Sequence, residues 1–138
     1  MEDLEIAKQT MKEKNLALVF VKDSKVIFES SSSGIKDLLK AVTEFDVKAS
    51  SVADKIVGKA AAFLLAFSQV KDVFAKVLSK HGLEVLKENR IPYEYETLAE
   101  RILNKNKTET CPFEKAVEKC KTPEEAFFKL TKLFEKIS

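Results

Sequence analysis

A segment near the middle of the chain combines a polar front with an apolar rear. Ser51, Asp54, Lys55 and Lys59 precede the run 60–67, which carries no polar side chain over more than two helical turns. A helix that is apolar on all sides has to be buried. We therefore predict a helix that opens at Ser51, whose rear lies in the core and whose N-terminal end points at a functional site.

Length and composition favour a single domain over residues 1–138. A chain of 138 residues can bury about two thirds of the surface that its unfolded form exposes. It is 45% hydrophobic and 33% charged with only 3 Gly and 3 Pro, which excludes disordered and collagen-like classes. We therefore expect a compact soluble domain that needs no disulfide or metal to fold.

The charge distribution argues against nucleic acid as a partner. The formal net charge is +2, and the basic residues are spread along the chain beside Glu and Asp. A nucleic-acid footprint would instead gather them into one basic patch. We therefore interpret the charges as solvated faces.

The cysteines and the N-terminus favour a cytoplasmic protein. The chain begins Met1-Glu2-Asp3-Leu4-Glu5, without the apolar core of a signal peptide, so Cys111 and Cys120 are expected to be free thiols. The longest apolar run, 60–67, is far shorter than the ~20 residues that cross a bilayer. We expect no membrane role.

Hydrophobic periodicity predicts alternating helices and strands. Helices are expected at 2–14, 35–45, 51–67, 81–89, 97–103, 111–120 and 122–137. Strands are expected at 16–21, 26–28, 70–78 and 91–95, with a turn at 22–25 and polar loops at 30–34 and 104–110. Strands separated by helices require a parallel portion in the sheet, so we predict an α/β fold with a mixed sheet.

Two motifs carry a resemblance to a known family. The segments SVADKIVGKAAA, from Ser51, and TCPFEKAV, from Thr110, resemble a small bacterial and archaeal domain-of-unknown-function family within the cytidine-deaminase-like fold superfamily. The resemblance extends from about Leu16 to about Leu130. It implies a three-layer α/β/α sandwich with a mixed sheet, and it supplies no activity.

The zinc chemistry of that superfamily lacks its ligands in this sequence. A zinc deaminase needs His or Cys two residues before Glu at one helix start, and Pro-Cys-x-x-Cys at the next. The first motif would fall near Ala53-Asp54-Lys55, which has no His or Cys, and the second near Leu78–His81, which offers one imidazole. We therefore expect no metal and no cofactor, and we interpret His81 as a surface or helix-cap residue.

The front of the predicted central helix suits an anion. Ser51 and Asp54 form a capping-box-like start, which accounts for Ser51 and is one of two readings of Asp54. Lys55 and Lys59 lie four apart near the positive end of the helix dipole, where an anion would offset their charge. They bind a phosphate or carboxylate, or they are rim lysines with solvated ends. Gly58 indicates close approach by a backbone or a ligand.

Cys111 provides a second candidate. Cys111-Pro112-Phe113-Glu114 matches Thr122-Pro123-Glu124-Glu125 in placing Pro at the first helical position, so Cys111 stands where Thr122 caps the next helix. A thiol caps poorly, but a helix N-terminus lowers its pKa and activates it. Cys111 is therefore a nucleophile, or a small buried residue with Thr110 or Thr108 as the cap. Glu114 beside it serves as a base or suppresses the thiolate, and it is also a candidate ligand contact.

These observations support a binding function, with catalysis left open. We predict a site for a small anionic or nucleotide-like metabolite, in which Ser51, Lys55, Lys59 and Glu114 contact the ligand. Asp54 orients it or acts as base, and Cys111 is the candidate nucleophile. The alternative is a non-catalytic interaction domain that forms homo-oligomers through its apolar helices.

Overall fold

A five-stranded mixed sheet forms the centre of the fold in the computed structural model, which describes residues 2–32, 34–102 and 111–137. Its strands are β1 (Leu18–Lys22), β2 (Lys25–Ser30), β3 (Ser51–Val57), β4 (Asp72–Ser79) and β5 (Tyr93–Ala99). They lie in the order β2-β1-β3-β4-β5, with β1 antiparallel to β2 and β3. The β3–β4 and β4–β5 pairs are parallel. The predicted hairpin and parallel portion are confirmed.

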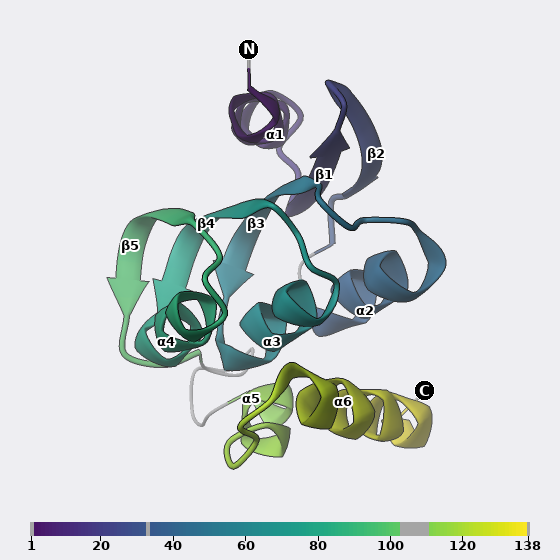
Figure 1. The fold of residues 1–138 in the computed structure, drawn as a ribbon, viewed down its shortest axis with the longest axis vertical. Helices are drawn as coiled ribbons and strands as arrows, with labels where there is room; N and C mark the ends of the chain where they lie inside the picture. Colours follow the sequence, from purple (N-terminus) through teal and green to yellow (C-terminus); the bar gives the residue numbers. More distant parts are fainter. Residues whose placement is uncertain (1, 33, 103–110, 138) are drawn as a thin grey trace.

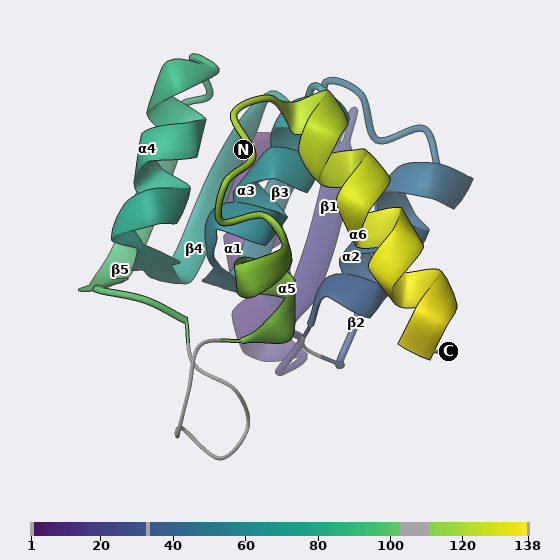
Figure 2. The same cartoon turned by 90° about the horizontal axis from the view of Figure 1, so that it is seen from below.

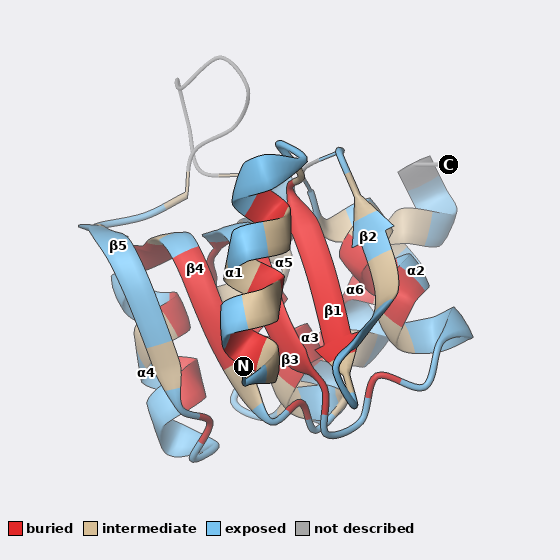
Figure 3. Cartoon of the chain, turned by 90° about the horizontal axis from the view of Figure 1, so that it is seen from above, coloured by how far each residue is buried: buried red, intermediate tan, exposed pale blue. Residues whose placement is uncertain are grey.

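Six helices within the described residues surround this sheet (Figure 1). They are α1 (Asp3–Glu13), α2 (Ile35–Glu44), α3 (Lys59–Phe67), α4 (Lys80–Glu88), α5 (Pro112–Ala116) and α6 (Pro123–Ile137). Helix α1 covers one face of the sheet, against the buried central strands β1, β3 and β4 (Figure 3). Helices α2, α3 and α4 cover the other face.

Helices α5 and α6 form an outer layer that a three-layer sandwich does not have. They lie on the far side of α3 from the sheet, and α6 crosses over α2 and α3 (Figure 2). The rings of Phe67 on α3 and Phe127 on α6 stack with centroids 4.2 Å apart. The reason is the composition of α3, whose residues 60–65 are all buried. A helix that is apolar all round needs a cover on its outer side as well.

The largest correction concerns residues 51–57, which form a central strand and not the first turns of a helix. Val52, Ile56 and Val57 are β-branched, and such residues suit a strand paired on both sides. The S-x-x-D spacing imitated a capping box, but Ser51 caps no helix. The apolar helix begins at Lys59, with Gly58 as its N-cap residue. The prediction of a buried rear was correct.

Two further boundaries differ from the predictions. Residues 97–99 continue β5, because they pair with β4 up to Ala99, so the predicted helix at 97–103 is wrong over that part. The helix expected at 111–120 ends at Ala116 and is followed by a turn. The predicted loop at 104–110 lies outside the described residues.

Candidate functional site

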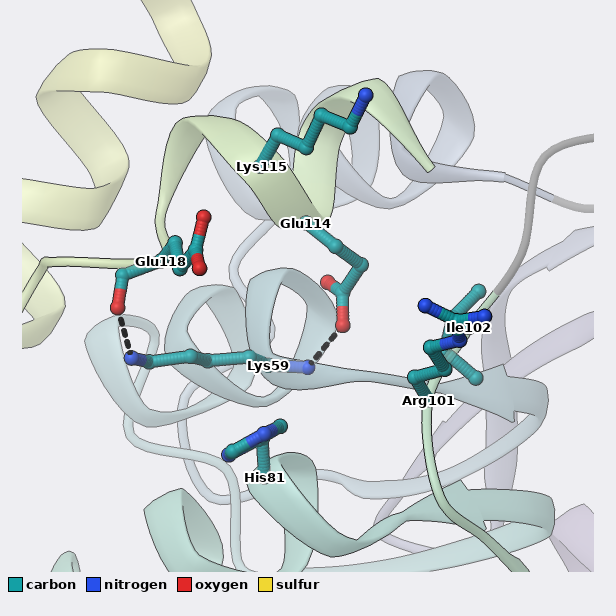
Figure 4. Close-up of a pocket in the computed structure, with 7 residues that line it drawn as sticks. All are labelled: Lys59, His81, Arg101, Ile102, Glu114, Lys115 and Glu118. Carbon is teal, nitrogen blue, oxygen red and sulfur yellow. Dashed lines mark hydrogen bonds between the residues drawn. The ribbon is translucent and has the colours of Figure 1, made fainter. Parts of the chain in front are cut away.

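A hollow of about 430 Å³ lies where the first turns of α3 and α4 meet α5 and the chain after β5 (Figure 4). It is lined by Lys59, His81, Arg101, Ile102, Glu114, Lys115 and Glu118. Three of these side chains are permanently basic and two are acidic. The hollow is therefore a mixed-charge cavity with an excess of basic groups.

The carboxylate of Glu114 caps α3 from a distant part of the chain. Gly58 has no side chain to cap the helix. Glu114 Oε1 accepts a hydrogen bond from the backbone N–H of Lys59 at 2.8 Å, and Oε2 accepts one from that of Ala60 at 2.7 Å. The amides at this helix N-terminus, which begins at Lys59 and not at the predicted Ser51, are thus capped by a carboxyl group of the protein itself.

Gly58 is required by this contact. A Cβ atom at position 58 would lie 2.3 Å from Glu114 Oε1 and 2.7 Å from Ile102 Cγ1. Both distances are shorter than real Cβ contacts, so a larger residue would displace the cap. The close approach expected at Gly58 is present, but the side chains of Glu114 and Ile102 make it in place of the expected backbone or ligand.

The first turn of α4 lies directly beside the first turn of α3. Ser79 caps α4 locally, because its Oγ accepts a hydrogen bond from the backbone N–H of Gly82 at 2.9 Å. A Cβ on Gly82 would lie 3.0 Å from the carbonyl group of Gly58. The positive ends of two helix dipoles therefore meet at this cavity.

Lys59 is held away from the capping carboxylate. Its ammonium donates a hydrogen bond to the backbone carbonyl of Glu118 at 2.7 Å, and its Nζ lies 5.8 Å from the centre of the Phe63 ring. His81 projects from α4 toward the same space, and Arg101 lies on the opposite wall (Figure 4). The basic groups thus surround the Glu114 carboxylate from α3, α4 and the segment after β5.

Two opposing effects act on Glu114. Burial raises the pKa of its carboxyl above the ordinary value, because the charged form is shielded from water. The two backbone N–H groups, His81 and Lys59 act in the opposite direction. Burial is the largest of these effects, so the carboxylate depends on its amide partners to remain charged.

Ser51 and Lys55 do not line this cavity. Ser51 is at the other end of β3, about 20 Å from Val57 at 3.3 Å per residue, and pairs with Val21 and Asp72. Lys55 is exposed on β3. The reason is the strand at 51–57, which carries these residues away from the helix N-terminus. Of the four predicted ligand contacts, only Lys59 and Glu114 lie together.

Asp54 is a buried carboxyl in the middle of the sheet. It pairs with Leu18 on β1 and Ala75 on β4, and only 8% of its surface is exposed. Burial raises its pKa to about 7, and weak bonds from the backbone of Ile56, at 3.4 Å, and Lys55 offset this only in part. Asp54 forms no ion pair with another described residue and is not among the residues that line the cavity.

Cys111 is the N-cap residue of α5, as predicted. It is half-buried, its thiol is free and its side chain caps nothing. Thr108 and Thr110, the alternative caps, lie outside the described residues. Cys111 does not line the cavity either, although Glu114 in the same short helix does.

Sequence reasoning missed Arg101 and Glu118 and gave Glu114 a different role. Glu114 is 54 and 55 residues from the amides that it caps, so no local spacing reveals the contact. The available signal is the absence of a capping side chain at Gly58, which requires an acceptor from elsewhere. No local feature of the sequence marks Arg101 as a residue of the site.

Neither a metal-binding cluster nor a membrane-spanning helix is found among the described residues. Within residues 2–32, 34–102 and 111–137, no three His, Cys, Asp or Glu side chains are arranged to hold a metal ion. No helix in this part of the chain is both long and apolar enough to cross a bilayer.

Comparisons with known proteins identify the family. The model of a domain of unknown function, DUF1893 (TM1506), matches residues 6–134. The crystal structure of a DUF1893 family protein (TM1506) from Thermotoga maritima is 33% identical, with a TM-score of 0.87, and the match covers 98% of this chain and 90% of that one. No curated protein matches the chain. The chain therefore belongs to the DUF1893 family of domains of unknown function.

Proposed function

We propose that the cavity between α3, α4 and α5 binds a small anionic or nucleotide-like metabolite. The observation that carries this proposal is the convergence of Lys59, Arg101 and two helix N-termini on a hollow of about 430 Å³. That volume lies within the range of small-molecule sites. Positive helix ends and basic side chains together favour an anion.

Arg101 is the residue best suited to contact the ligand. Its side chain is exposed on the wall of the cavity, and its guanidinium makes no ion pair with another described residue. A guanidinium presents a planar set of donors that matches a carboxylate or a phosphate. His81, on the facing wall, adds a further hydrogen-bonding group (Figure 4).

We also propose membership of the cytidine-deaminase-like superfamily. A mixed sheet between helices, and a cavity at the starts of two successive helices that each follow a parallel strand, support this assignment. In zinc deaminases these helix starts carry the metal ligands. Here they carry Lys59 and the run 79–82, in which only His81 is of a ligating type. This donor set does not fit zinc, so we propose no zinc chemistry.

The proposal concerns binding and assigns no reaction. Asp54 and Cys111, the candidate base and nucleophile, are absent from the cavity lining. The roles that remain on the proposed ligand are charge neutralisation by Lys59 and Arg101 and hydrogen bonding by His81.

A thermal-shift screen tests this function. Nucleoside monophosphates and inorganic phosphate are titrated against the wild type and Arg101→Ala. At ten times the Kd, binding stabilises by about 1.4 kcal/mol, which is about 4 °C for a domain of this size. The matched control is Arg90→Asn, since Arg90 follows the C-cap of α4, at the end away from the cavity, and has a left-handed φ of 59° that Asn tolerates. The expected result is a shift that Arg101→Ala removes and Arg90→Asn keeps. Absence of any shift with every probe contradicts the proposal.

Homo-oligomerisation is a second candidate function, favoured by the outer side of α6. Phe128 is 62% exposed and lines a shallow hollow with Leu133, Lys129, Lys132 and Lys136. A symmetric contact through this face would bring the lysines of both copies together, so we rank it second. Light scattering of the wild type and Phe128→Glu tests it, and a monomeric wild type contradicts it.

A further inference from the structure

Glu114 occupies the most favourable anion position at the edge of the cavity. Its two carboxylate oxygens accept from two successive amides of α3, at 2.8 and 2.7 Å. A ligand carboxylate or phosphate would make the same pair of bonds. Any anion that reaches these amides therefore has to replace the Glu114 side chain.

The helix that carries Glu114 is short and is anchored at its C-terminal end. Helix α5 has only five residues, and Cys111, its N-cap residue, makes no side-chain capping bond. Phe113 packs against the core, and Val117, the C-cap residue, is fully buried. These apolar contacts hold α5 in place without Glu114, so the Glu114 side chain can leave the two amides while α5 stays on the core.

The cavity also contains an alternative partner for the Glu114 carboxylate. The charged and titratable groups that line the cavity around it are Lys59 from α3, His81 from α4, Arg101 from the segment after β5, and Lys115 and Glu118 from its own part of the chain. Of these, the Lys115 side chain points away from the Glu114 carboxylate (Figure 4). Arg101 stands across the opening from the capping position and is free of ion pairs among the described residues. A displaced carboxylate would thus find a cation on the opposite wall.

We propose that Glu114 is an autoinhibitory side chain that competes with the anionic group of the ligand for the amides of Lys59 and Ala60. This inference rests on the proposed function and adds its regulation. The ligand class that follows is a carboxylate or a phosphate monoester, whose terminal oxygens can span two neighbouring N–H groups. Binding then releases the Glu114 side chain from the start of α3.

The test measures binding of inorganic phosphate by NMR, with the amide signals of Lys59 and Ala60 as reporters. Phosphate is titrated into the wild type, Glu114→Ala and Glu118→Gln at constant ionic strength. Glu118 is the matched control because it lines the same cavity, yet its bond to Lys59 uses the backbone carbonyl. The control separates the loss of a negative charge from the release of the two amides.

The proposal predicts that Glu114→Ala binds phosphate about thirtyfold more tightly than the wild type, with large shifts at both amides. Glu118→Gln should gain at most about fivefold. Should Glu114→Ala fail to fold, as judged by circular dichroism, Glu114→Gln replaces it, with a smaller gain expected because one oxygen remains.

The outcomes separate the two proposals. Equal affinity in wild type and Glu114 variants overturns the competition and leaves the binding function in place. Equal gains from Glu114→Ala and Glu118→Gln also overturn it, because charge alone then explains the effect. If neither the wild type nor any variant binds phosphate, the proposed anion site itself fails, and the competition fails with it.

Discussion

Among the residues that the structure describes, Glu114 and Asp54 both have carboxyl groups withdrawn from water, but the partners of the two groups differ. Glu114 is placed against two backbone N–H groups at the start of α3, within reach of basic side chains. Asp54 lies in the central strand with only weak bonds from the backbone of Ile56, at 3.4 Å, and of Lys55, and with no counter-ion among the described residues. Burial raises the pKa of both. The comparison shows that partners, more than depth, decide whether a buried carboxylate supports the fold or weakens it.

The largest expected effect is that of Asp54→Asn on the pH dependence of stability. With a pKa of about 7 in the folded state against 3.8 for the free group, folding favours the protonated form. Stability is therefore fully present below pH 4 and is lost as the pH rises toward 7, by up to about 4 kcal/mol. Asp54→Asn should remove this loss.

Denaturant unfolding at pH 4 and pH 8 measures the free energy of unfolding of the wild type and of Asp54→Asn. Because Asn cannot ionise, the stability of the variant relative to the wild type should increase between the two pH values. An equal change in both chains would show that Asp54 has a partner that the comparison overlooks.

The next largest effect concerns Glu114 and the helix cap that it forms. Glu114→Ala removes two charge-assisted hydrogen bonds and should destabilise the fold by about 2 to 3 kcal/mol. Gly58→Ala should cost a similar amount, because its Cβ would lie 2.3 Å from Glu114 Oε1 and would expel the cap.

A double-mutant cycle links these two changes. If both act on the same contact, Gly58→Ala should cost about 1 to 2 kcal/mol less in the Glu114→Ala background. Urea unfolding of the four chains gives the coupling. Additive costs would mean that Ile102, the other neighbour of Gly58, is responsible for the clash.

The smallest effect compares a neutral, local cap with the charged, distant one. Ser79→Ala removes the hydroxyl that accepts from Gly82, and such N-cap losses cost about 1 kcal/mol. Thermal unfolding of Ser79→Ala and Glu114→Ala compares the stability that each cap contributes. If Ser79→Ala destabilises the protein as much as Glu114→Ala or more, the charged cap is not the stronger of the two.

The parts of the fold that sequence could predict are those with local signals. The periodicity of α1, α2, α4 and α6 and the alternation around the turn at Asp23 and Ser24 place those elements within a few residues. Thr122 could be identified as a cap because its partner, the amide of Glu125, is three residues away. These predictions depend on neighbours along the chain.

The parts that sequence could not predict depend on distant partners. Residues 51–57 pair with β1 and β4, and their β-branched residues are only a weak local signal for a strand beside the helix-like S-x-x-D spacing and the apolar run that follows. The Glu114 cap joins residues more than 50 apart. The sequence therefore supplied Lys59 and Glu114 as candidate site residues, while the helix start at Lys59 and the further lining residues Arg101 and Glu118 emerged only from the three-dimensional arrangement.

Strand β5 forms one border of the sheet, and almost all of its residues are exposed. Its unpaired N–H and C=O groups could extend the sheet into a neighbouring molecule, with Tyr95 and Leu98 as apolar contacts. Glu94 and Glu96 lie on the same strand, and Glu94 pairs with Lys8 at 2.8 Å. Charged side chains on an edge strand disfavour strand pairing between molecules, so this border is protected against edge-to-edge association.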